Sequence, residues 1–213
     1  YEIELPLVGK GEIGALAQSF RHMVAVVRQT NQELEQKVKD RTEDLQRLTE
    51  IDPLTGLLNR RGIMDRFEQE IARQTRQGSS LGILLLDLDN FKQVNDTYGH
   101  VAGDVALCST ANILQSMKRS YDHAGRWGGE EFLILLPECS EQDLLVIAER
   151  IREAVQSLRV EAGTGDFSFT VSIGAHHPKT PQTPDAMLSQ ADKALYKAKE
   201  AGRNNVYLAN QVT

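Results

Sequence analysis

The sequence is poor in cysteine and has no long hydrophobic run. Among its 213 residues the two cysteines, Cys108 and Cys139, lie far apart and match no metal-ligand spacing. Free thiols in a reducing cytosol are therefore expected, rather than the disulfide framework of a small secreted domain. No apolar run approaches the ~18 residues that a membrane span needs, and no secretory signal peptide is present in this sequence.

Positive charge is also in short supply. The sequence has 24 Lys and Arg against 30 Asp and Glu, which gives a formal net charge of -6. This balance argues against a nucleic-acid-binding surface, so no nucleic-acid partner is expected. A polyanionic nucleotide can still bind an acidic protein that supplies metal ions and a few local cations.

The N-terminal part of the sequence has a heptad pattern. Apolar residues recur at alternating spacings of four and three for about five heptads. Valines at a positions and leucines at d positions favour two parallel strands, and Asn31 at an a position can fix the register. The alternative is a single amphipathic helix lying on its own domain, which the polar character of residues 28–50 disfavours. We predict a parallel coiled-coil dimer, in which Arg41 is a weak d position. The heptad positions are Ile13, Ala17, Phe20, Val24, Val27, Asn31, Leu34, Val38, Arg41, Leu45 and Leu48.

A globular domain follows the heptads. Pro53 and Gly56 interrupt the helix, and helical and strand patterns then alternate around a central hairpin. This order predicts an α/β fold with an antiparallel component. We expect helices at about 60–77, 91–96, 103–118, 140–158 and 184–201, and strands at about 81–87, 123–136 (the hairpin), 168–175 and 205–208.

Carboxylates follow a run that reads as a buried strand. The apolar residues 83–86 lead into Asp87 and Asp89, and Phe91-Lys92 then begins a helix. One acid at a strand end often does no more than reach solvent. Two acids before a helix start favour a site for phosphate and a hard cation, because ligands of α/β folds lie at strand ends.

The hairpin carries a second pair of acids. Gly128-Gly129-Glu130-Glu131 separates an aromatic residue from a short apolar strand. A solvated turn is the simpler interpretation of this stretch alone. The functional interpretation is a backbone without side chains that a bulky anion can approach, beside a carboxylate ready for a metal. Asp87 and Glu130 could meet if the 81–87 strand lies beside the hairpin, and such carboxylates serve phosphoryl or nucleotidyl transfer.

Two cations lie near the C-terminus. Lys199 and Arg203 are four residues apart and would share a face on one continuous helix, although Gly202 falls near the helix end. A solvated basic helix end explains them equally well. Beside a triphosphate they would neutralise its oxygens.

Four stretches together resemble the GGDEF family of diguanylate cyclases. They are DPLTGLLNRRG, DLDNFKQVNDTYGHVAGD, RWGGEEF in the family's Glu variant, and ADKALYKAKEAGRN, and the resemblance spans residues 52–208. It implies a central mixed sheet flanked by helices, similar to nucleotidyl cyclases and polymerase palms. It also implies that two GTP molecules condense to cyclic di-GMP and two pyrophosphates, with Mg²⁺ or Mn²⁺, in a homodimer.

The resemblance assigns roles to individual residues. Asp87, Glu130 and the carbonyl of Leu88 would bind metal, Glu130 would also help to deprotonate the attacking hydroxyl, and Glu131 would support them. Gly128 and Gly129 would let the nucleotide come close. Asp104 favours GTP over ATP, because a carboxylate accepts from the guanine N1–H and amino group. The remaining substrate contacts would be Asn95 to guanine and Phe91, Lys92, Lys199 and Arg203 to phosphate.

An R-x-x-D stretch precedes the hairpin. Five residues separate Asp122, the end of this stretch, from Gly128, as in the family's inhibitory site for the product cyclic di-GMP. Arg119 and Asp122 match that site, and Arg150 resembles a further contributor. The alternative is an ordinary surface ion pair. A catalytically silent receptor for GTP or cyclic di-GMP, a structural relay and a cyclase making an adenine-containing product remain as alternatives for the whole chain.

The first stretch, LPLVGKGEIGALAQSFRHMV, resembles the second half of a HAMP domain. This resemblance implies a membrane sensor upstream. Because the sequence starts at Tyr1 rather than Met, we expect the cytoplasmic portion of a longer bacterial inner-membrane protein. The expected divisions are a partial HAMP domain at 1–30, a coiled-coil signalling helix at 31–51 and the GGDEF domain at 52–213.

Overall fold

The computed structural model describes residues 18–20, 22–34, 37, 50–161 and 165–209. The chain divides into two compact units, Tyr1–Thr49 and Glu50–Thr213. In the first unit the described residues are helical, and three of the expected heptad positions are open to solvent: Phe20 is 51%, Val27 53% and Leu34 59% exposed. Ile13, Ala17, Val38, Arg41, Leu45 and Leu48 lie outside the described residues. Within the described part of the chain, no helix is both long and apolar enough to cross a membrane.

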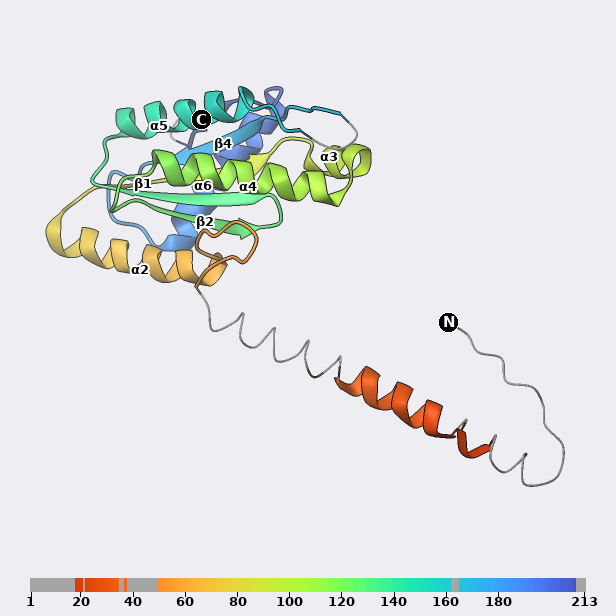
Figure 1. Ribbon diagram of the computed structural model, residues 1–213. Coiled ribbons are helices and arrows are strands. Elements are labelled where there is room, and N and C mark those ends of the chain that lie inside the picture. The colour runs from red at the N-terminus through yellow and green to blue at the C-terminus, as the bar shows by residue number, and fades with distance from the viewer. Residues whose placement is uncertain (1–17, 21, 35–36, 38–49, 162–164, 210–213) are drawn as a thin grey trace. The chain divides into compact units, whose positions relative to one another are not determined.

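The second unit is built on a five-stranded mixed sheet with the strand order β2-β3-β1-β4-β5 (Figure 1). All neighbours are antiparallel except β4 and β5, which are parallel. The strands are β1 (Leu81–Leu88), β2 (His123–Gly128), β3 (Glu131–Pro137), β4 (Val171–His176) and β5 (Val206–Leu208). The helices are α2 (Arg60–Gln77), α3 (Phe91–Tyr98), α4 (His100–Met117), α5 (Glu141–Gln156) and α6 (Pro184–Glu200).

Helices cover both faces of the sheet, so β1 is buried along its whole length. Successive side chains of a strand point to opposite faces. Ile83 and Leu85 accordingly pack in a cluster with residues of α2 and α6. Leu84 and Leu86 pack in the larger cluster with residues of α4 and α5. A strand buried on both faces must be apolar throughout, which explains the unbroken run that predicted it.

Local sequence signals fix where the helices begin. The Asn59 side chain accepts a hydrogen bond from the Gly62 N–H and caps α2. Ser140 and Asp143 form a capping box at the start of α5, and Thr183 caps α6, whose first residue is Pro184. All elements expected in the globular domain are present. Helix α4 begins at His100 instead of about 103, because Gly99, with a positive φ of 85°, joins it directly to α3.

Helix α6 lies very close to the middle of β4. A Cβ atom at Gly174 would overlap the backbone of α6 at Ala191 and Leu195. Glycine is therefore required at this position for the close approach of helix and sheet, rather than for its own backbone angles. The contact fixes the distance of α6 from the sheet.

Candidate functional site

Asp87 lies near the end of the central strand β1, between strands β3 and β4. It follows Leu85 on the face of β1 that α6 covers, and its register partners are Glu131 on β3 and Ser172 on β4. The Lys199 ammonium on α6 lies 2.7 Å from an Asp87 oxygen. Burial raises the pKa of the Asp87 carboxyl, the Lys199 contact lowers it, and the charges of Glu130 and Asp89 raise it further.

The β2–β3 hairpin brings the second acid to this place. Gly129 has a positive φ of 51°, which glycine adopts without strain, and a Cβ at Gly128 or Gly129 would meet nothing within 4 Å. The carbonyl of Glu130 accepts a hydrogen bond of 3.3 Å from the Leu88 N–H. Glu130 therefore lies at the end of β1, as expected if the 81–87 strand is the neighbour of the hairpin.

An arginine holds the tip of the hairpin. The Arg126 Nε donates to the Gly129 carbonyl at 2.9 Å, and an Nη atom of the same guanidinium lies 3.4 Å from an Asp52 oxygen. Asp52 is itself fixed by the backbone N–H and hydroxyl of Thr55. One side chain thus joins the first turn of the domain to the turn that presents Glu130.

The group of acids suits a hard cation. Burial raises the pKa of Glu131, and the negative charge of Asp87 adds to this rise. A divalent cation between such carboxylates would relieve their repulsion, and Mg²⁺ in nucleotide sites binds to one or two carboxylates together with phosphate oxygens. Among the described residues no three His, Cys, Asp or Glu side chains form a metal site by themselves. The donor set fits a cation that shares its coordination with a bound phosphate.

A cavity of about 310 Å³ opens beside these charges. Glu131 and Lys199 line it, together with Leu195 and Tyr196 of α6. The charged atoms of the site are therefore within reach of a bound molecule, although Asp87 itself is only 12% exposed at its side chain.

Helices α3 and α4 carry four residues that are expected to contact the nucleotide. Phe91 and Lys92 begin α3, and the preceding Asn90 is left-handed and makes no side-chain cap, so the first N–H groups of α3 have no Asn90 side-chain acceptor. The Asn95 side-chain oxygen packs directly on the backbone of Gly103 in α4. Asp104, the residue after Gly103, is exposed. The helix pair thus places Asn95 and the residue before Asp104 in contact.

Arg203 does not share a helical face with Lys199. Helix α6 ends at Glu200, and Gly202 and Arg203 both have positive φ values, 107° and 66°. The helix expected at about 184–201 thus ends before Arg203, so the shared face that a continuous helix would give does not form. Arg203 is exposed and lies in the tight turn between α6 and β5.

Asp89 has a position that the sequence did not reveal. It is only 5% exposed, and its carboxylate accepts hydrogen bonds from the hydroxyls of Thr170 and Ser172 and from the Asn204 N–H. The sequence pattern identifies Asp89 only as one of two acids at a strand end. Its partners lie 81 to 115 residues away, so no local pattern could have identified them.

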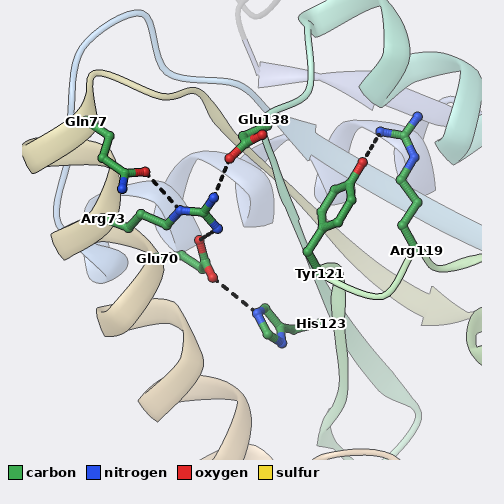
Figure 2. Close-up of polar contacts among 7 residues, drawn as sticks. All are labelled: Glu70, Arg73, Gln77, Arg119, Tyr121, His123 and Glu138. Atoms are coloured by element: carbon green, nitrogen blue, oxygen red, sulfur yellow. Dashed lines mark hydrogen bonds and ion pairs between the residues drawn. The ribbon is translucent and has the colours of Figure 1, made fainter.

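The R-x-x-D residues do not form a side-chain ion pair. Asp122 is buried and accepts from the backbone N–H of Arg119 at 2.7 Å. The Arg119 guanidinium is bonded to the Tyr121 hydroxyl at 3.1 Å (Figure 2). The alternative of an ordinary surface ion pair was therefore wrong, and Arg119 presents an exposed cation. Arg150 is exposed on α5.

Two histidines of the second unit, His123 and His176, make structural contacts. His123 lies 3.3 Å from Glu70 of α2, which is also near Arg73, and Arg73 continues to Glu138 after β3 (Figure 2). This group joins α2 to both strands of the hairpin at the end opposite Glu130. His176 is buried, with Nε2 3.0 Å from the Gln182 amide oxygen.

Comparison with known proteins places this geometry in a family. The family described as diguanylate cyclase, GGDEF domain, matches residues 49–205. The diguanylate cyclase DosC of Escherichia coli is 42% identical over 159 residues, which are 74% of this chain and 35% of DosC. The chain thus spans about a third of the length of that relative.

Solved structures give the same result. Diguanylate cyclase SiaD of Pseudomonas aeruginosa, in complex with its activator SiaC, is 39% identical with a TM-score of 0.72, and the match covers 91% of this chain and 74% of SiaD. The GGDEF domain of DgcB from Caulobacter crescentus, in complex with c-di-GMP, is 31% identical with a TM-score of 0.74, over 76% of this chain and 97% of that domain. The chain belongs to the GGDEF diguanylate cyclase family.

Proposed function

We propose that the chain is a diguanylate cyclase that condenses two GTP molecules into cyclic di-GMP and two pyrophosphates. The observation that carries this proposal is the group of Asp87, Glu130, Glu131 and Lys199 at the end of β1, beside a glycine turn, in a chain of the GGDEF family. Each of these residues has the charge that a nucleotidyl transfer requires.

The reaction consists of two equivalent displacements. The 3′-hydroxyl oxygen of each GTP attacks the α-phosphorus of the other, a new P–O bond forms, and the bond to the bridging oxygen breaks to release pyrophosphate. Glu130 accepts the hydroxyl proton, and Asp87, Glu130 and the Leu88 carbonyl would hold Mg²⁺ or Mn²⁺. The cation supplies charge neutralisation at the phosphates when it is bound.

The other residues bind and orient the nucleotide. Asn95 and Asp104 read the guanine edge, where a carboxylate matches the two donors that adenine lacks. Phe91 and Lys92 contact phosphate at the start of α3, and Lys199 and Arg203 contact it from the other side. Glu131 supports the charge balance of the site.

Two copies of the chain are needed, because one site holds one half of the reactants. The heptads of the first unit would form a parallel coiled coil that keeps two domains together, and the stretch before about residue 30 would be part of a HAMP domain. The relay would connect to a membrane sensor in a longer bacterial protein. The expected divisions at 1–30, 31–51 and 52–213 belong to this proposal.

Product inhibition is proposed for the R-x-x-D site. Arg119, Asp122 and Arg150 would bind cyclic di-GMP, and the exposed Arg119 guanidinium can contact guanine and phosphate. Arg119→Ala should relieve inhibition by added cyclic di-GMP without lowering the maximal rate. Inhibition of the same strength in that variant would contradict the assignment.

The decisive experiment incubates the purified chain with GTP and Mg²⁺ and separates the nucleotides by chromatography. Cyclic di-GMP should form with the wild type and with Glu68→Gln, an exposed acid of α2, but not with Glu130→Gln. Bound GTP without product would make the chain a receptor or a dimer in an unproductive arrangement. Equal product from Glu130→Gln would remove that residue from the mechanism.

A further inference from the structure

The turn between α6 and β5 is held in an unusual backbone conformation. Arg203 and Asn204 are consecutive non-glycine residues with positive φ values, 66° and 45°. Side chains with a Cβ adopt this region rarely, so the surrounding structure must hold the turn in place. The contacts of these two residues identify what holds it.

Asn204 is held from two sides. Its backbone N–H donates to the buried Asp89 carboxylate at 3.0 Å. Its side-chain oxygen accepts from an Nη atom of Arg152 on α5 at 2.9 Å. The Arg203 N–H continues the turn with a bond to the Ala198 carbonyl at 3.1 Å.

Asp89 is well placed to act as the fixed end of this arrangement. Its Oδ1 accepts from the Ser172 hydroxyl at 2.6 Å, and its Oδ2 accepts from the Thr170 hydroxyl at 2.7 Å as well as from Asn204. The Asp89 N–H bonds to the Thr170 carbonyl at 2.9 Å. The Asp89 carboxylate is thus bonded to Thr170 and Ser172 at the start of β4, and its Oδ2 also accepts from the Asn204 N–H in the turn.

We propose that Asp89 is the positioning residue for the phosphate-binding cation Arg203: its carboxylate holds the left-handed Arg203–Asn204 turn against the end of β1. The proposal rests on the proposed function and deepens it, because it explains how a residue outside α6 is directed to the same site as Lys199. Asp89 itself touches neither substrate nor metal. It acts through the Asn204 backbone.

A double-mutant cycle tests this coupling. The probe is a GTP analogue with a methylene group in place of the α,β-bridging oxygen, whose affinity is measured by calorimetry with Mg²⁺. Asp89→Ala and Arg203→Ala should each weaken binding about tenfold, and the double variant should be no weaker than the worse single variant. Losses that multiply in the double variant would overturn the proposal, since Asp89 would then act independently of Arg203.

Matched variants separate positioning from general stability. Ser172→Ala removes the hydrogen bond to Asp89 Oδ1 but leaves the Thr170 hydroxyl on Oδ2, the oxygen that accepts from the Asn204 N–H. Its affinity should therefore stay near that of the wild type even if its melting temperature falls. Asp89→Asn should recover most of the affinity, because an amide oxygen can still accept from the Asn204 N–H while the amide nitrogen donates to Ser172. Affinity that follows melting temperature across these variants would contradict a positioning role.

A second route to the same turn covers the case in which Asp89→Ala does not fold. Arg152→Ala removes the other restraint on Asn204 and should also weaken the analogue in a manner that disappears in the Arg203→Ala background. The binding assay and the cyclase assay distinguish the two proposals. A coupled cycle in a chain that forms no cyclic di-GMP at any protein concentration would overturn the cyclase and keep the positioning role. An active cyclase with independent losses would overturn the positioning role and keep the cyclase. A wild type that does not bind the analogue would overturn the positioning role.

Discussion

Asp87 and Lys199 form the central ion pair of the site, and each changes what the other can do. The ammonium offsets part of the cost of burying the carboxylate, which is why the two are found 2.7 Å apart. Binding a nucleotide and a cation would replace this contact, with Lys199 turning to phosphate and Asp87 to metal. The two charges of the site therefore lie in direct contact.

Removing the ammonium should raise the pKa of Asp87. Lys199 opposes the effect of burial on that carboxyl, so Lys199→Met leaves burial and the neighbouring acids unopposed. A carbon-detected NMR titration of the nucleotide-free protein should show Asp87 ionising at higher pH in the variant. Lys193→Met, an exposed lysine of the same helix, serves as the control and should leave the Asp87 titration in place. A lower or unchanged Asp87 pKa in Lys199→Met would contradict this account.

His176 should make the fold sensitive to acid. Burial lowers the pKa of His176 below the usual value of a histidine, and the hydrogen bond to Gln182 opposes this with a smaller effect. The folded state therefore takes up this proton only at lower pH than the unfolded state, and stability is lost as pH falls from about 6.5 toward the folded pKa. Thermal unfolding at about pH 7.5 and about pH 5.5 should show a smaller loss for His176→Gln than for the wild type.

The exposed His100 provides the control for that measurement. His100→Gln should retain the acid sensitivity of the wild type. Identical losses in the wild type and His176→Gln would mean that His176 does not contribute to it.

At the scale of elements, the hairpin depends on a side chain from its own first strand. Arg126 bonds the Gly129 carbonyl and reaches Asp52, so Arg126→Gln should release the turn while the buried strands stay intact. Hydrogen exchange should become faster at residues 128–130 and remain unchanged in β1. Cyclase activity should fall with it, because Glu130 is presented by this turn. Unchanged exchange at the turn would show that the glycines alone define its shape.

Arg60 offers a comparison at the same hairpin. Its guanidinium lies 4.5 Å from the centre of the Trp127 ring, so it contacts the strand rather than the tip. Arg60→Gln should leave exchange at Gly129 and Glu130 near that of the wild type.

The sequence predicted the elements well and their relations less well. The apolar run of β1 and the capping residues Asn59, Ser140 and Thr183 are local signals, so the strand and the helix starts could be read directly. The position of Asp87 beside Glu131 depends on strand order and register, which local patterns do not encode. The bond from Asn204 to Asp89 depends on side chains that meet only after the sheet has formed.

Two site expectations show the same limit. The spacing of Lys199 and Arg203 would give one helical face only on a continuous helix, but α6 ends at Glu200 and the backbone has positive φ values at Gly202 and Arg203. The R-x-x-D spacing suggested an ion pair as its simplest meaning, yet Asp122 bonds a backbone N–H instead. In both cases the main chain, rather than the side-chain spacing, determined the result.

At the scale of the whole molecule, activity should depend on the first unit. If the heptads join two copies, the tether keeps the second domain at an effective concentration in the millimolar range, on the order of 10⁻³ M. The specific activity of the full 213-residue chain should then change little on dilution, whereas that of residues 50–213 should fall steeply. Light scattering at the same concentrations should show dimers of the full chain and monomers of the shorter one. Equal dilution curves would remove the tether from the account.

The absence of a Cβ at Gly174 has a consequence for how this protein could be altered. Helix α6 carries Lys199, and β1 carries Asp87, so the closeness of helix and sheet sets the gap between the two charges. Gly174→Ala would add one methyl group far from any reacting atom. Because that methyl would overlap the backbone of α6, the helix would have to move away from the sheet and carry Lys199 away from Asp87. A substitution at position 174 could thus change the distance between Lys199 and Asp87 without altering any residue of the site.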